Sequence, residues 1–261
     1  FTALEKRVYN PFSVVRLFEA GEFENFWFET ATPSFLVNLI KEQEYPIPDI
    51  ENLELAKEDF TVYELDNLEL EALLFQTGYI TIHDFDNTLY RMGYPNQEVK
   101  TSFLSYLFRY SARLKDKKLR SAYKRLHICL DEKNIEKFID IVKSILASIP
   151  YVQIAGQGED YYHTVFYLML SASGVTVHTE VLTSTGRIDI AVEFDDKVYI
   201  IELKCNYSSE KAVQQILDKK YYEKYAETGR EIYLMGINFD TEKRSVDDWQ
   251  WGTLDEYLEN A

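Results

Sequence analysis

A hairpin with a two-residue turn constrains the fold of this chain more than any other feature. Apolar and polar residues alternate on both sides of Asp195-Asp196. This alternation predicts two β-strands with one face in a core. If Asp195 and Asp196 form the turn, Asp189 lies directly opposite Glu202. One face then carries Ile188, Ile190, Val192, Tyr199, Ile201 and Leu203, and the other carries Arg187, Asp189, Glu202 and Lys204.

Two carboxylates facing each other across this hairpin indicate a bound cation. Cross-strand partners lie about 4.5–5.5 Å apart at Cβ, and like charges there destabilise a sheet. A divalent cation between Asp189 and Glu202 reverses that repulsion, and Mg²⁺ prefers such hard oxygen ligands. We therefore predict a metal site at Asp189 and Glu202. Lys204, on the same face, is expected to orient a water molecule or to offset transition-state charge.

Glu180, on the preceding strand, is a third candidate ligand. A two-residue turn at Ser184-Thr185 would place it opposite Asp189 and give a row of three carboxylates. A three-residue turn, which Gly186 equally allows, would move Glu180 to the other face. Both registers are compatible with the sequence.

The first 150 residues predict a mostly helical module. Proline at the first helical positions predicts helix starts at Pro11 and Pro33. Two short strands around a turn at Asp84–Asn87 predict a hairpin. The remaining helices are expected at residues 68–76, 98–113, 119–130 and 135–149, and Pro150 is the expected domain boundary.

Residues 151–261 predict a second domain with the order helix, three strands, helix, strand. Its helices are expected at residues 159–173 and 209–228, and its last strand at 230–239. A strand, long helix and strand in succession indicate a crossover connection, so the sheet is expected to be mixed. The chain as a whole is therefore predicted to be α+β.

Composition excludes several classes of protein. The chain has no run of 18 apolar residues and no charged segment leading into an apolar stretch, so we expect no membrane contact, no signal peptide and a cytoplasmic location. Its two cysteines, Cys129 and Cys205, argue against a disulfide scaffold, and the absence of paired Cys or His spacing argues against zinc.

The charge is distributed unevenly. The net charge of −16 argues by itself against a polyanionic partner, yet residues 97–150 carry 12 Lys and Arg against 6 Asp and Glu. A basic segment of this kind either neutralises phosphates or forms a solvated helical surface. It comprises Arg109, Arg113, Lys115, Lys117, Lys118, Arg120, Lys124 and Arg125.

The pattern of acidic residues resembles the PD-(D/E)XK nuclease superfamily. The matching positions are Glu159, Glu180, Asp189, Glu202, Lys204 and Gln215, with Ile188 in the place of the Pro in the short signature. The resemblance implies a restriction-endonuclease-like α-β-β-β-α-β domain that hydrolyses phosphodiester bonds of DNA, or of RNA, with Mg²⁺ or Mn²⁺. Those six residues would be catalytic, with Asp189, Glu202 and Glu180 as metal ligands.

The amino-acid sequences of these motifs are similar to those of one branch of that superfamily in particular. In that branch the domain is appended to bacterial and archaeal AAA-ATPase-like proteins, and residues 1–107 resemble the end of the ATPase-like region. The sequence begins at Phe1 and contains no G-x-x-x-x-G-K-[ST], so the nucleotide site is expected in an upstream region that this chain lacks. The alternative is a non-cutting nucleic-acid-binding or assembly module of an ATPase-linked protein.

A few residues around the predicted site have secondary roles. Gln215 and Tyr222 lie seven apart on one predicted helix and would share a face toward the site or the nucleic-acid backbone, unless that face simply packs. Arg187, opposite Lys204, is a candidate phosphate contact. His163, one helical turn after Glu159, would support the site, although a core or surface position is the simpler reading.

Overall fold

The structure is a computed structural model that describes residues 11–21, 34–43, 45–56, 69–112, 122–150 and 158–259. The chain divides into two compact units, Phe1–Leu107 and Phe108–Ala261. We predicted a boundary at Pro150. The division falls earlier in the sequence because the helices between 122 and 148 pack on the helix at 159–173 and on the C-terminal sheet. As the limit of an independently folding domain, Pro150 stays a prediction.

The N-terminal unit combines helices with a three-stranded antiparallel sheet of order β1-β3-β2. The helix predicted at Pro11 is confirmed, and Gly21, with φ of 73°, ends it. Asp86 fixes the expected hairpin turn, because its Oδ1 accepts the N–H groups of Thr88 and Leu89. The elements are α1 Pro11–Ala20, α3 Ser34–Glu42, η1 Ile47–Asn52, β1 Leu53–Leu55, α4 Leu70–Gln76, β2 Thr81–Phe85, β3 Tyr90–Gly93 and α5 Gln97–Ser111.

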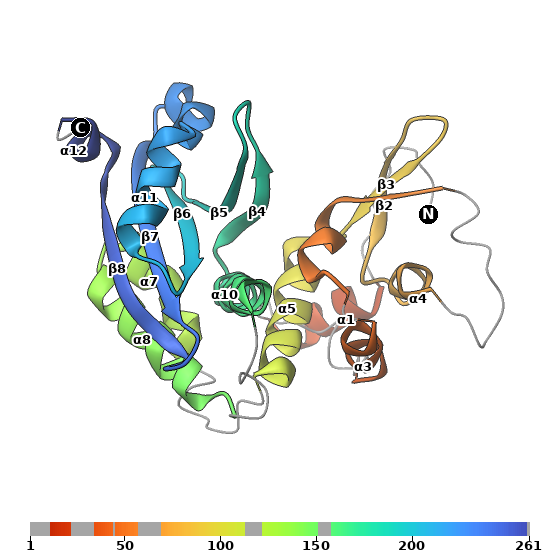
Figure 1. Ribbon diagram of the computed structural model, residues 1–261. Coiled ribbons are helices and arrows are strands. Elements are labelled where there is room, and N and C mark those ends of the chain that lie inside the picture. The colour runs from red at the N-terminus through yellow and green to blue at the C-terminus, as the bar shows by residue number, and fades with distance from the viewer. Residues whose placement is uncertain are drawn as a thin grey trace. The chain divides into compact units, whose positions relative to one another are not determined.

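The C-terminal unit is built on a five-stranded sheet of order β4-β5-β6-β7-β8 (Figure 1). Strands β6 and β7 are parallel and the other neighbours are antiparallel, so the predicted mixed sheet is confirmed. The strands are β4 Thr176–Leu182, β5 Arg187–Glu193, β6 Lys197–Cys205, β7 Glu231–Asp240 and β8 Ser245–Thr253. The helices are η3 Tyr123–Arg125, α7 Leu126–Asp131, α8 Ile135–Ser148, α10 Glu159–Ser173, α11 Ser209–Asp218, η4 Tyr221–Thr228 and α12 Leu254–Glu259.

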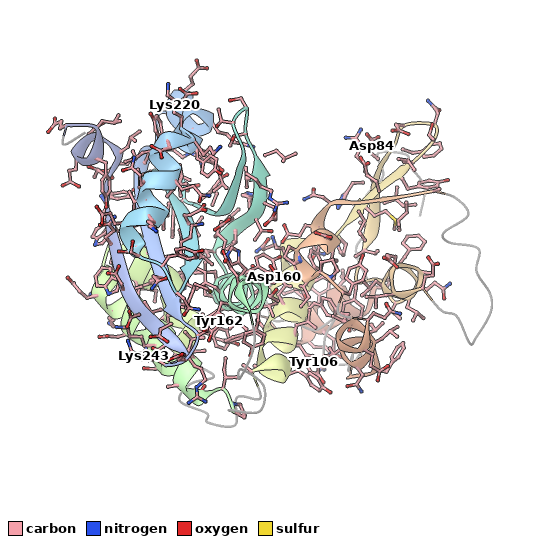
Figure 2. The ribbon with its side chains drawn as sticks, viewed as in Figure 1. Asp84, Tyr106, Asp160, Tyr162, Lys220 and Lys243 are labelled. Atoms are coloured by element: carbon pink, nitrogen blue, oxygen red, sulfur yellow. The ribbon has the colours of Figure 1, made fainter. Side chains whose placement is uncertain are left out.

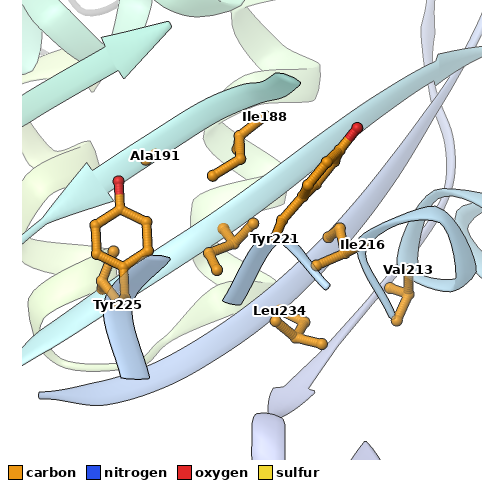
Figure 3. Close-up of a cluster of buried hydrophobic side chains, with 9 residues drawn as sticks. Ile188, Ala191, Val213, Ile216, Tyr221, Tyr225 and Leu234 are labelled. Atoms are coloured by element: carbon orange, nitrogen blue, oxygen red, sulfur yellow. The ribbon is translucent and has the colours of Figure 1, made fainter. Parts of the chain in front are cut away.

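Helices cover both faces of this sheet, so the expectation of a single buried face is wrong. On one face α11 and η4 enclose a hydrophobic cluster (Figure 3). Ile188 belongs to this cluster together with Val198 and Ile200, although we had predicted it on the face of Tyr199. On the other face the Tyr199 hydroxyl donates to the Leu130 carbonyl of α7 at 2.6 Å. There Tyr162 of α10, labelled in Figure 2, stacks on Phe239 of β7. Parallel central strands with a crossover helix are normally buried on both faces.

The connection between β6 and β7 is two helical segments rather than the one predicted. The Ser208 side chain caps α11 by accepting the Lys211 N–H at 3.2 Å, as a serine at a helix start should. Lys220 then adopts a left-handed conformation, with φ of 51°, between α11 and the 3₁₀ segment η4. Gly229, with φ of 71°, ends η4 at the position where we expected the helix to end.

Gly236 lets α11 lie close on β7. A Cβ atom at this position would overlap the carbonyl oxygen of Ser209 and lie 3.0 Å from the side chains of Ala212 and Val213. In the parallel ladder Gly236 is the partner of Glu202. The close approach therefore occurs beside the residue on which the candidate site depends.

No helix in the described part of the chain has the length and apolar character needed to cross a membrane.

Candidate active site

The hairpin turn sets the register of the two strands that carry the site. The Phe194 N–H donates to the Lys197 carbonyl at 2.9 Å, which confirms the two-residue turn. The ladder between β5 and β6 runs from Glu193 opposite Val198 to Ile190 opposite Ile201. Asp189 and Glu202 are the next residues in this register. The Asp189 Oδ2 atom accepts the Leu203 N–H at 2.9 Å, so its carboxylate is held against β6.

Glu202 is the buried centre of the cluster. Its side chain is 1% exposed, and its Oε1 atom lies 2.8 Å from the Lys204 ammonium. The same oxygen accepts a hydrogen bond from Gln215 Nε2 of α11. Its second oxygen, Oε2, is buried and has no hydrogen-bond partner among the described residues. A buried carboxylate oxygen without a partner is costly, and it indicates a role beyond folding.

The electrostatics of the cluster favour an additional positive charge. Burial and the Asp189 carboxylate raise the pKa of Glu202 to about 7, although the Lys204 ammonium acts in the opposite direction. Burial opposes the charge on Lys204, but Glu202, Asp189 and Glu159 outweigh it and raise the pKa of the ammonium. When ionised, three carboxylates act on one ammonium, which leaves an excess of negative charge.

Helix α10 brings a histidine and a further carboxylate to the same place. His163 Nε2 lies 3.6 Å from Glu159 Oε1 and 3.7 Å from Asp189 Oδ2. Sequence reasoning favoured a core or surface position for His163, and the structure places it between two candidate site residues. The signal was present in the sequence, because residues four apart on a helix share a face.

Glu180 does not join the carboxylates of Asp189 and Glu202. It lies in β4 with φ of 55°, between the pairs Thr179–Ile190 and Val181–Ile188. Its carboxylate forms an ion pair with Arg187 at the exposed end of the hairpin. The carboxylate of Glu180 is therefore paired with Arg187 and does not complete a row of three with Asp189 and Glu202.

The other candidate contacts divide into three groups. Tyr222 packs against the hydrophobic cluster under η4, so it does not share a helical face with Gln215. Lys124 and Arg125 of η3 are exposed, as a phosphate contact requires. Arg113, Lys115, Lys117, Lys118 and Arg120 lie outside the described residues.

The residues present fit a divalent cation in charge and donor type. Within the described ranges no three His, Cys, Asp or Glu side chains are grouped as a complete ligand set. Asp189 and Glu202 nevertheless supply the one or two carboxylates that Mg²⁺ or Mn²⁺ commonly takes from a protein, with water and substrate oxygens completing the sphere. The unpartnered Glu202 Oε2 is the oxygen that such an ion would satisfy.

Comparisons with known proteins identify the superfamily of the C-terminal domain. A curated protein of Azotobacter chroococcum mcd 1, described as an uncharacterized protein in the vnfD 5' region, is 35% identical over 250 residues. The match covers 92% of this chain and 48% of the relative, so the chain spans about half the relative's length. No solved structure matches the chain significantly. Residues 157–249 match the family model of the PD-(D/E)XK nuclease superfamily, and this part of the chain is a domain of that superfamily.

Proposed function

We propose that the C-terminal unit is a metal-dependent nuclease that hydrolyses phosphodiester bonds of nucleic acid, with DNA as the expected substrate. The observation that carries this proposal is the buried Glu202 carboxylate, bonded to Lys204 through one oxygen and unpartnered at the other, beside Asp189. This arrangement does not stabilise the fold, because a buried oxygen without a hydrogen-bond partner lowers the free energy of unfolding. An oxygen left free in this way is available to a metal ion that assists hydrolysis.

Each residue has a distinct part in this reaction. Asp189 and Glu202 bind Mg²⁺ or Mn²⁺, which when bound polarises a phosphoryl oxygen and lowers the pKa of a water ligand. Lys204 places a compact positive charge where negative charge develops on the phosphoryl group. Gln215 holds the Glu202 carboxylate in position through its hydrogen bond to Oε1. Glu159 adds negative charge from the first turn of α10.

Nucleic acid requires positive charge outside this acidic centre. The exposed Lys124 and Arg125 of η3 are candidate phosphate contacts, together with Arg113, Lys117, Lys118 and Arg120 of the same basic segment. An upstream ATPase-like region, of which residues 1–107 would be the end, is proposed as a partner in the same polypeptide. The length of the Azotobacter relative is compatible with such a region.

A cleavage assay with matched hairpin variants tests the proposal. Supercoiled plasmid, end-labelled single- and double-stranded DNA, and RNA are incubated with Mg²⁺ or Mn²⁺ and with EDTA. Asp189→Asn is expected to reduce metal-dependent cleavage by at least about 100-fold, because it removes a ligand of the ion. Asp195→Asn changes the same atoms at an exposed turn position and is expected to retain full cleavage. Absence of cleavage by the unmodified protein on every substrate would favour the non-cutting module instead.

A further inference from the structure

We propose that His163 is a nitrogen ligand of the ion held by Asp189 and Glu202, in the place that the sequence suggested for Glu180. This inference rests on the proposed metal-dependent function and adds to it the identity of a ligand. Glu180 is engaged with Arg187, whereas His163 lies beside Asp189. The ligand set would therefore come from α10, β5 and β6 rather than from three adjacent strands.

The distances around His163 suit donors of a shared ion better than hydrogen bonds. Its Nε2 atom is 3.6 Å from Glu159 Oε1 and 3.7 Å from Asp189 Oδ2. An N–H···O hydrogen bond has a donor–acceptor distance of about 2.7–3.2 Å, so neither contact qualifies. Two donors that each lie about 2.0–2.2 Å from one ion are about 3–4 Å apart. Both separations fall within that range.

The His163 nitrogen also lacks any other use in the described structure. Nε2 is buried and has no hydrogen-bond partner among the described residues, which is the same condition as Glu202 Oε2. The two buried, unpartnered atoms lie on α10 and on β6, and Asp189 neighbours both residues: it is 3.7 Å from the His163 nitrogen and its charge raises the pKa of Glu202. Buried polar atoms are normally satisfied, so a shared absent partner explains both. Glu159, whose side chain is 45% exposed, has room to rotate toward the same ion.

A nitrogen ligand predicts a metal preference. Carboxylate and water ligands suit Mg²⁺, Ca²⁺ and Mn²⁺ alike, whereas imidazole suits transition metals, so an imidazole ligand adds affinity for Mn²⁺ that Mg²⁺ gains little of. With His163 as a ligand, the site should hold Mn²⁺ more tightly than Mg²⁺ by a margin that depends on this side chain. Replacing His163 should remove most of the Mn²⁺ advantage while changing Mg²⁺ affinity little.

The test reads metal binding and not cleavage. Mn²⁺ and Mg²⁺ are titrated calorimetrically into the whole chain, and electron spin echo spectroscopy of bound Mn²⁺ detects a coordinated imidazole nitrogen. The unmodified protein is expected to show the nitrogen coupling, and His163→Gln to lose it together with at least about tenfold in Mn²⁺ affinity. His178→Gln is the matched control, because His178 Nε2 also lies 3.6 Å from a carboxylate oxygen, that of Glu193, away from the site.

The outcomes separate this inference from the proposed function. If Mn²⁺ binds, is lost in Asp189→Asn, and shows no nitrogen coupling in the unmodified protein, the His163 assignment is overturned and the metal site stands. If His163→Gln and His178→Gln bind Mn²⁺ with equal affinity, the assignment is likewise overturned. If the unmodified protein binds neither ion, both proposals fail. Circular dichroism of His163→Gln distinguishes loss of a ligand from loss of the fold.

Discussion

Strand β6 carries a lysine–carboxylate cluster at each end, and the two clusters are built in opposite ways. At its start the Lys197 ammonium is buried, 4% exposed, and lies 2.9 Å from both Asp131 and Asp196, which are well exposed. At its end the carboxylate of Glu202 is buried and Lys204 is the more exposed partner. In the first cluster, two solvent-exposed carboxylates form ion pairs with the buried ammonium of Lys197. The second buries an acid beside another acid and leaves one oxygen unpartnered.

The pKa directions follow this difference. The hydrogen bond from Lys197 lowers the pKa of Asp196, as in an ordinary ion pair. Burial raises the pKa of Glu202 to about 7 despite Lys204. The lesson is that a lysine beside a carboxylate is not informative by itself. The cluster that carries excess negative charge in a buried position is the one that indicates a ligand.

The largest expected effect comes from making the same substitution at both lysines. Lys204→Met leaves Glu202 and Asp189 without their cation in a buried site and is expected to lower the free energy of unfolding by about 3–5 kcal/mol at pH 8. Lys197→Met keeps the apolar stem, and its exposed partners regain water, so a change under about 1 kcal/mol is expected. Urea denaturation in EDTA measures both. Equal losses would show that the two clusters do not differ as argued.

The second effect is a pH dependence of stability that originates in Glu202. The ordinary pKa of a glutamate, 4.5, is raised to about 7 for Glu202 in the folded protein. Between these values the folded state holds more protons than the unfolded state, so the free energy of unfolding falls as the pH rises. At about 1.4 kcal/mol for each pKa unit, the fall amounts to at most about 3.5 kcal/mol and is complete above the folded pKa.

Urea denaturation at intervals from pH 5 to pH 8 in EDTA measures this fall, and Glu202→Gln is the comparison. The glutamine has no proton to lose, so the variant should lack this component and should be more stable than the unmodified protein at pH 8. Parallel profiles for the two proteins would assign the pH dependence to other groups.

The smallest of these effects concerns how the Glu202 carboxylate is held. Gln215→Ala removes the amide that donates to Glu202 Oε1 and is expected to weaken Mn²⁺ binding by about tenfold, as for other residues that orient a ligand. Gln214→Ala, one position earlier, removes an amide that donates to the exposed Asp218 and should leave binding unchanged. Calorimetric titration measures both. Unchanged affinity in Gln215→Ala would mean that Glu202 needs no such support.

The parts of the site that could be predicted from sequence are those fixed by short-range rules. The Asp195-Asp196 turn determines the register of β5 and β6, and that register was confirmed because a two-residue turn leaves little choice. The turn before β5 also has two residues, Ser184 and Thr185, since the Thr183 N–H donates to the Gly186 carbonyl at 2.8 Å, and its register leaves Glu180 opposite Asp189. The side chain of Glu180 nevertheless pairs with Arg187. The backbone of Glu180 has a φ of 55°, which a non-glycine residue seldom adopts, and no sequence pattern predicts it.

The break in the helix after β6 was also beyond prediction. Lys220 adopts a left-handed conformation although neither glycine nor proline marks the place, and tertiary packing of Tyr221 and Tyr225 accompanies it. The pattern of residues 209–228 alone favours one continuous helix. Tyr222, which follows the break, packs against the hydrophobic cluster, the alternative that the sequence left open for it. Gln215, which precedes the break, reaches Glu202.

The missing side chain at Gly236 has a consequence for how this domain tolerates change. Because Gly236 has no Cβ atom, α11 packs directly on the backbone of β7 beside Glu202, and this sets the distance between the helix and the sheet. Any larger residue would lift the helix and carry Gln215 away from its partner. Packing at Gly236 therefore determines where Gln215 lies relative to Glu202, and a substitution there is expected to disturb the candidate site without changing any of its side chains.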